Sequence, residues 1–314
     1  MEEATGKKPF EEKAKEWYSK KYKLLLIIPL IVLVVSLIII VGHYNKTNEI
    51  FEKDVSLKGG VTATVYSSEQ ISIAEVQNFL LSKFSNVQGA DISVRKLTEF
   101  GSDKQIGISI EASNIDATEL KKSLEEKLGI ELSMENFSLE EVGSSLGESF
   151  YQQMLWAMVA AFVLMAIVVF FIFKSLAPSL MVVLSAFADI VGPIAVLDLM
   201  NFKISSAGIS ALLLLIGYSV DTDMLLTTRV LKRNEGRVVD RVFSSFITGI
   251  MMSLTSFSAV VVGYFVANSP VLKEVFLIIS IGLIFDIFNT WLTNTGLIMW
   301  YMERKNAIKK VSNI

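Results

Sequence analysis

The sequence predicts a polytopic α-helical membrane protein with one folded α+β domain outside the membrane. Hydrophobic residues make up 52% of its 314 residues and charged residues only 19%, which excludes an ordinary soluble domain and a disordered chain. Long apolar runs flank a segment of roughly a hundred residues with the composition of a soluble domain. The net charge of −3 comes from mixed signs without a basic face, so we expect no nucleic-acid partner.

The first apolar run predicts an uncleaved transmembrane helix over residues 24–43, behind a charged cytoplasmic tail at residues 1–23. A signal peptide is the alternative, but the run is longer than a usual h-region and no small-residue cleavage site follows it. The chain has no cysteine and a single histidine, His43. Disulfides, thiol nucleophiles, and Cys-based or multi-histidine metal sites are therefore excluded, and we expect no cofactor.

Residues 44–149 have the patterns of a soluble domain. The expected elements are strands at 61–66, 91–97, 105–112 and within 131–141, and helices at 72–84 and 116–128. The order strand, helix, strand, strand, helix, strand predicts a ferredoxin-like sheet with helices on one face. Gly59 and Gly60 precede the first strand, where a tight turn would let the chain enter the sheet.

Residues 150–301 return to the membrane, and residues 302–314 form a short tail. The five further spans are expected at 151–173, 179–200, 207–230, 244–267 and 274–301. Lysine and arginine gather in the two tails and in alternate loops, which predicts a multi-pass protein of the cytoplasmic membrane with both termini in the cytoplasm. The sequons at Asn45 and Asn136 would then lie outside, and their glycosylation stays open.

Four carboxylates lie deep in the predicted spans, at Asp189, Asp221, Asp223 and Asp286. A carboxylate at the bilayer centre costs on the order of 3 kcal/mol, so such groups usually face a partner helix or a watery path. Asp189, Asp221 and Asp286 each lie about ten residues from a span end, which predicts one shared polar site at mid-membrane. Asp221 and Asp223 point about 200° apart on a helix, so they cannot both face it.

These four aspartates are candidates for a proton or cation relay, because a mobile charge in the membrane can couple an ion gradient to a conformational change. Arg229, two turns from Asp221, is a candidate counter-charge that also marks the cytoplasmic boundary. The alternative is that the aspartates are hydrogen-bonded packing groups between helices, supported by nearby serines and threonines. Asp198 lies at a span end and is expected to be solvated.

Polar residues in the last two spans also allow two interpretations. In the fifth span, small and hydroxyl residues such as Thr248 and Ser253 predict either close helix packing or a polar path. The sixth span adds a polar face after Asp286, formed by Asn289, Thr290, Thr293 and Asn294.

The fourth span contains Gly-Tyr-Ser-Val-Asp-Thr-Asp at residues 217–223, and Leu-Lys-Gly-Gly-Val precedes the first strand. With this topology, the chain resembles the SecF family, especially its archaeal type. The matching motif residues are Gly59, Gly60, Gly217, Tyr218 and Ser219, and Asp189 and Asp286 resemble the polar positions of helices 3 and 6. Bacterial members typically read Asn-Asp-Thr where this chain has Asp-Thr-Asp, so its carboxylates are displaced by one position.

The resemblance implies half of a resistance-nodulation-division transporter fold, surrounded by membrane lipid and paired with a SecD subunit of the same architecture. It also implies a place beside the SecY-containing channel, an unfolded preprotein as client, and use of the proton gradient, as in bacterial relatives. No P-loop is present, so we expect a non-enzymatic subunit of the Sec translocation machinery. The alternatives are an independent exporter of small molecules or lipids, and a scaffold that stabilises the channel.

Overall fold

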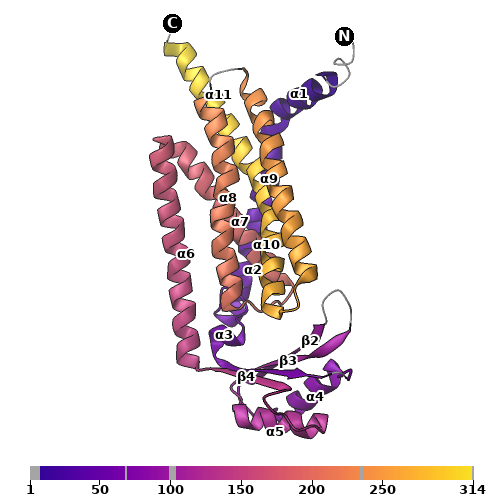
Figure 1. Ribbon diagram of the computed structural model, residues 1–314. Coiled ribbons are helices and arrows are strands. Elements are labelled where there is room, and N and C mark those ends of the chain that lie inside the picture. The colour runs from indigo at the N-terminus through magenta and orange to yellow at the C-terminus, as the bar shows by residue number, and fades with distance from the viewer. Residues whose placement is uncertain (1–7, 68, 99–103, 234–235, 313–314) are drawn as a thin grey trace, which may run out of the picture.

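The computed structural model describes residues 8–67, 69–98, 104–233 and 236–312, which form a helical bundle with a small sheet domain at one end (Figure 1). Among these residues, five helical segments are long and apolar enough to cross a membrane. They are Glu11–Thr47, which joins α1 (Lys8–Leu25) to α2 (Ile27–Thr47), and the helices α6 (Ser144–Phe173), α7 (Leu176–Leu199), α8 (Ser206–Lys232) and α9 (Val238–Val266). The chain is therefore a multi-pass membrane protein.

The predicted sixth span is built from three consecutive pieces. These are α10 (Pro270–Phe288), a π-helix η1 (Asn289–Asn294) and α11 (Thr295–Ser312). α10 packs against α7, α8 and α9, although it carries the charged residues Lys273, Glu274 and Asp286. It is not among the five apolar segments, so a sixth crossing stays a prediction.

The charged leader is helical over its described part. α1 packs against α9 and α11, and Tyr18 and Tyr22, which share one face of α1, reach into the bundle. The hydroxyl of Tyr18 donates to the carbonyl of Trp291 at 3.0 Å, and Lys15 pairs with Asp240 at 3.2 Å. This part of the leader is therefore a packed element at the end of the bundle.

Glycines allow the inner helices to approach α10 closely. A Cβ at Gly192 of α7 would lie 2.2 Å from Cδ1 of Phe285, and a Cβ at Gly282 would lie 2.2 Å from Cδ2 of Leu215 on α8. Such close approach is typical of helix contacts in membranes, where small residues take the place of large ones at the interface. It brings the polar residues of α7, α8 and α10 together.

The outer domain is a four-stranded antiparallel sheet in the order β2-β3-β1-β4. Its elements are β1 (Gly60–Tyr66), α4 (Ile73–Lys83), β2 (Asp91–Thr98), β3 (Gln105–Ser113), α5 (Ala117–Leu128) and β4 (Phe137–Val142). This element order is the one expected from the sequence. Both helices begin at a side-chain cap, because Ser72 accepts from the amide of Glu75 and Asp116 accepts from the amides of Thr118 and Glu119.

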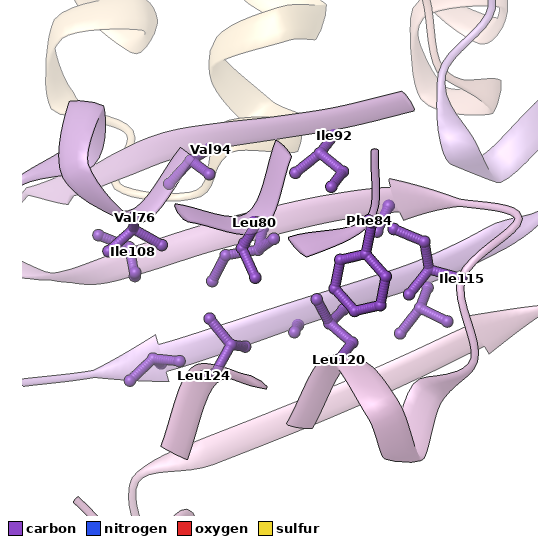
Figure 2. Close-up of a cluster of buried hydrophobic side chains, with 14 of the residues drawn as sticks. Val76, Leu80, Phe84, Ile92, Val94, Ile108, Ile115, Leu120 and Leu124 are labelled. Atoms are coloured by element: carbon purple, nitrogen blue, oxygen red, sulfur yellow. The ribbon is translucent and has the colours of Figure 1, made fainter. Parts of the chain in front are cut away.

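The apolar core of this domain lies between the sheet and the two helices. Val76 and Leu80 of α4 and Leu120 and Leu124 of α5 pack on the inward residues of the strands, such as Ile108 (Figure 2). Both helices therefore cover one face of the sheet, and they lie on its side away from the bundle (Figure 1). The other face of the sheet carries the alternate residues of each strand, and it is turned toward the membrane helices.

Gly59 and Gly60 join the short helix α3 (Val55–Lys58) to β1. Their φ angles are +83° and +145°, which L side chains rarely adopt. A Cβ at Gly59 would lie 2.4 Å from Cα of Ser144, and a Cβ at Gly60 would lie 2.4 Å from the carbonyl oxygen of Ala112. The tight turn predicted here is confirmed, and its glycines also permit contact with the start of α6.

The outer domain rests on the loop between α7 and α8. Lys53 and Ile204 form a parallel β-bridge, in which the amide of Asp54 donates to the carbonyl of Ile204 at 3.0 Å and the amide of Ile204 donates to that of Glu52 at 2.8 Å. Lys203 pairs with Asp91 of β2 at 2.5 Å. The segment that enters the sheet is thus bonded directly to the outer ends of the inner helices.

Candidate intramembrane site

Three of the four predicted aspartates meet inside the bundle. Asp189 of α7, Asp223 of α8 and Asp286 of α10 are each 0% exposed. Asp221 is exposed on the outward face of α8. This agrees with the angle of about 200° that separates Asp221 from Asp223 around a helix. The prediction of one polar site formed by Asp189, Asp221 and Asp286 is therefore corrected, because the helix turns Asp223 inward and Asp221 outward.

Asp189 is held by one residue of α8 and one residue of η1. The hydroxyl of Ser219, from the motif on α8, donates to Oδ2 at 2.5 Å. The Nδ2 amide of Asn289, the first residue of η1, donates to Oδ1 at 2.7 Å. Both carboxyl oxygens are thereby bonded to neutral donors.

Asp286 is surrounded by hydroxyl groups. The Oγ1 atoms of Thr222 and Thr290 lie 3.0 Å and 3.4 Å from its Oδ1, and Oγ of Ser253 on α9 lies 3.4 Å from its Oδ2. Thr222 also lies 2.9 Å from the carbonyl oxygen of Ser219. A single turn of α8 therefore connects Asp189 to Asp286.

Asp223 has a less complete set of partners. The Nδ2 amide of Asn294, the last residue of η1, donates to its Oδ1 at 2.8 Å. Its Oδ2 has no hydrogen-bond partner among the residues described, and neither has the nearby hydroxyl of Ser185. Buried polar atoms usually find a partner, so this end of the site has room to change its hydrogen bonds.

The three buried aspartates have no cationic partner in the described part of the chain. Arg229, the candidate counter-charge, instead donates from Nη1 to the carbonyl of Ser244 at 2.7 Å and to Oγ1 of Thr248 at 2.9 Å, both on α9. No group of three or more histidine, aspartate or glutamate residues that could hold a metal ion occurs in the ranges described. Carboxyl groups that are bonded to neutral donors and not to a cation are suited to taking up and releasing protons.

The π-helix η1 is the feature that sequence reasoning missed. Asn289 and Asn294 were expected as part of a regular polar face, but residues five apart point about 140° apart on an α-helix. The wider i→i+5 ladder of the π-helix brings both amides onto the aspartates of α7 and α8. Two asparagines five apart in an apolar helix were the available signal.

Asp198 differs from its expected solvated state. Only 2% of its side chain is exposed, and its Oδ1 lies 3.9 Å from Nδ1 of His43 on α2. α2 packs on α7 and covers this end of the span. The sequence shows only that Asp198 lies near the end of an apolar run, and it does not show that a neighbouring helix covers it.

Comparison with known proteins shows the family of this chain. The sequence pattern of "Protein export membrane protein SecD/SecF, C-terminal" matches residues 121–304, which include all three buried aspartates and η1. The protein-export membrane protein SecF of Methanolacinia petrolearia is 34% identical over 90% of this chain and 94% of its own length. SecF of Pyrococcus furiosus is 32% identical over 95% of this chain and 97% of its own. The chain belongs to the SecF family.

The fold of this SecF-family chain is also found in solved structures. SecDF of Thermus thermophilus, described as a translocon-associated membrane protein, aligns with a TM-score of 0.73 at 16% identity over 91% of this chain. SecDF in a super-membrane-facing form aligns with a TM-score of 0.62 over 95% of this chain, also at 16% identity. This chain spans only 38% and 40% of the lengths of those two chains.

Proposed function

We propose that this SecF-family chain is a non-enzymatic auxiliary subunit of the Sec machinery that promotes preprotein export across the cytoplasmic membrane. Two comparisons support this role: its relatives are named protein-export membrane proteins, and the SecDF that shares its fold is described as translocon-associated. The proposal includes a SecY-containing channel as neighbour and an unfolded preprotein as client.

The ion-coupling part of the proposal is carried by one observation: three fully buried aspartates lie on three different helices, and their partners among the described residues are neutral donors. An unpaired charge in a medium of low dielectric constant is costly. Each proton that enters or leaves the site therefore changes the hydrogen bonds that join α7, α8 and α10. We propose that this change couples a proton gradient to movement of the bundle.

The partner part of the proposal rests on the outward face of α8. Ser210, Leu214, Gly217 and Asp221 are exposed and, at spacings of four, three and four, form one stripe. A Cβ at Gly217 would meet nothing within 4 Å. A carboxylate that faced lipid at mid-membrane would cost about 3 kcal/mol, so we propose that a SecD-like subunit covers this stripe.

The outer domain and the termini complete the proposal. The strand order β2-β3-β1-β4 with both helices on one face supports a ferredoxin-like domain. α1 begins and α11 ends at the end of the bundle away from the sheet (Figure 1). This arrangement, with the basic residues of those helices, supports an extracytoplasmic sheet and cytoplasmic termini.

Preprotein export in cells that carry Asp189→Asn or Asp286→Asn tests ion coupling. Asparagine keeps the shape but not the exchangeable proton, so we expect export to fall while the chain remains abundant in the membrane. Glu131→Gln, an exposed change in the outer domain, is the matched control. Normal export with both aspartate variants would contradict coupling and would favour a packing role.

Gentle detergent extraction of the tagged chain tests the partner. We expect a SecD-like subunit to copurify, and we expect Gly217→Trp to reduce its recovery because the indole would occupy the α8 stripe. Val163→Trp, on the exposed face of α6, is the control for a bulky residue on the bundle surface. Recovery of the unchanged chain alone, as a self-assembly, would contradict the proposal and favour an independent exporter.

A further inference from the structure

A cavity of about 590 Å³ lies between the sheet and the outer ends of α8 and α10. Its wall on the sheet side is the face without helices and includes Thr64 of β1. Four carboxylates line it, namely Asp54 just before α3, Glu111 of β3, Glu140 of β4 and Glu274 of α10. Arg95 also lines it, so carboxylates outnumber cations four to one among the described lining residues. The cavity is therefore acidic, and it lies apart from the intramembrane aspartates.

Two of these carboxylates are buried without full pairing. Asp54 is 9% exposed and its Oδ1 has no hydrogen-bond partner among the described residues, and Glu111 is 8% exposed with its Oε2 equally unpaired. The other oxygen of Glu111 lies 3.3 Å from Nη1 of Arg95. Asp54 and Glu111 line the same cavity, and Asp54 lies close enough for its charge to act on the carboxyl group of Glu111.

The surroundings of Glu111 raise the pKa of its carboxyl group. Burial and the neighbouring charge of Asp54 raise the pKa of Glu111 to about 8, and the positive charges of Arg95 and Lys203 only partly oppose this rise. The carboxyl group of Glu111 therefore holds a proton at neutral pH. Glu274, from the start of α10, is also buried, and its Oε1 accepts from the amide of Ser205 at 2.7 Å.

We propose that this cavity binds the cationic side chain of a lysine or arginine in an extended polypeptide segment, held by Asp54 and Glu111. This inference rests on the proposed role in export, because it requires a polypeptide on the outer side of the membrane. A donor-rich cation satisfies the unpaired oxygens of both carboxylates at once, and charge-assisted hydrogen bonds of this kind are the strong ones.

The size and lining of the cavity favour a side chain of a polypeptide over a bare metal ion. A volume of about 590 Å³ is that of roughly twenty water molecules at about 30 Å³ each, and it lies within the usual range for organic ligands. The ranges that the structure describes contain no cluster of three carboxylate or histidine ligands for a metal ion. Hydroxyl groups such as that of Thr64 can bond to a peptide backbone.

Glu111 holds a cation most strongly as a carboxylate, so its proton leaves when the cation binds. Because that proton is held below a pH of about 8, affinity rises as the pH increases from 6.5 to 8.5. The same increase is absent in Glu111→Gln, where no proton is displaced. This link to pH separates the cavity from a general attraction of basic peptides to an acidic surface.

The test uses the purified full chain in detergent and fluorescent Gly-Ser peptides with blocked termini that contain one Arg or, as a control, one Gln. Fluorescence anisotropy at fixed ionic strength measures binding. We expect the Arg peptide to bind about tenfold tighter than the Gln peptide, and Asp54→Asn and Glu111→Gln to weaken it by about tenfold each. Glu131→Gln, an exposed change outside the cavity, leaves binding unchanged.

A second variant guards against misfolding of the charge variants. Thr64→Phe fills the cavity from β1 with a residue that strands accept well, and it abolishes binding while the circular dichroism spectrum stays unchanged. Equal binding of the Arg and Gln peptides would overturn the inference, as would unchanged affinity in folded Asp54→Asn and Glu111→Gln. Competition by methylammonium as effective as that by the Arg peptide would overturn its polypeptide part.

The two proposals can fail separately. A chain that supports export but binds no Arg peptide overturns the cavity inference alone. A chain that binds the peptide at Asp54 and Glu111 but supports no export contradicts the proposed function instead.

Discussion

Gly59 is the residue on which entry into the sheet depends most directly. With φ +83° and ψ 152° it occupies a region that only glycine adopts readily. In any other residue this conformation costs about 1–3 kcal/mol of stability. Gly59→Ala is therefore expected to destabilise the chain by at least that amount, since its Cβ would also meet Ser144. Thermal unfolding of the purified protein measures the loss.

Gly143 provides a matched control at the same junction. It has φ −62° and its Cβ would meet nothing within 4 Å, so Gly143→Ala should leave the unfolding midpoint nearly unchanged. If Gly59→Ala and Gly143→Ala lowered the unfolding midpoint equally, the conformation of Gly59 would not require glycine.

Glu111 predicts how stability depends on pH. Its pKa is raised from 4.5 to about 8 in the folded protein, so between these values the folded state holds a proton that the unfolded state has released. Stability therefore falls as the pH rises through this interval. We expect the outer domain to exchange amide hydrogens with solvent more readily at pH 8.5 than at pH 6, after correction for the intrinsic exchange rate.

Two variants isolate the contribution of Glu111. Glu111→Gln should remove most of the pH effect. Asp116→Asn should not, because hydrogen bonds from the amides at the start of α5 lower the pKa of Asp116, so its titration lies well below pH 6. An undiminished pH effect in Glu111→Gln would assign the effect to another group.

Among the elements, the π-helix η1 has the most specific role, because it supplies an amide to each of two buried aspartates. Asn294→Ala leaves the Oδ1 of Asp223 without its donor. An unsatisfied buried group of this kind costs about 1–3 kcal/mol. We expect a loss of that size in thermal unfolding, together with reduced export.

Thr293→Ala is the control within the same element. Thr293 is only half-buried and its hydroxyl lies 3.3 Å from Oδ1 of Asn289, so its loss leaves both aspartates bonded. An effect as large as that of Asn294→Ala would mean that η1 matters through its backbone and not through its asparagines.

The elements also show what the sequence can predict. The two faces of α8 follow from the angle between Asp221 and Asp223, and the outer-domain elements follow from alternation and caps at Ser72 and Asp116. Local patterns carry this information. The π-helix and the burial of Asp198 depend on neighbouring helices, so a single-sequence pattern does not contain them.

For the whole molecule, the seat of the outer domain on the bundle is expected to be apolar and not ionic. Ile204 is fully buried and packs with Phe51 and Leu57, and truncation of such a residue costs about 2–5 kcal/mol. Lys203 forms a partly exposed ion pair with Asp91, and pairs of this kind contribute about 0–1 kcal/mol. Ile204→Ala should therefore loosen the domain far more than Lys203→Ala.

Limited proteolysis of the outer domain in the detergent-solubilised chain measures this difference. Faster cleavage with Ile204→Ala alone agrees with an apolar seat. Faster cleavage with Lys203→Ala alone would show that the ion pair holds the domain in place.

The attachment of the sheet also decides how a mechanical load would travel. The two chain crossings between sheet and bundle run through neighbouring strands, because Gly60 of β1 is paired with Val142 of β4, and they lead to α2 and α6. A pull on the far edge, at β2, acts on this corner as a torque. The Lys53–Ile204 bridge and the Lys203–Asp91 ion pair would then transmit this load to the loop between α7 and α8, the helices that hold Asp189 and Asp223.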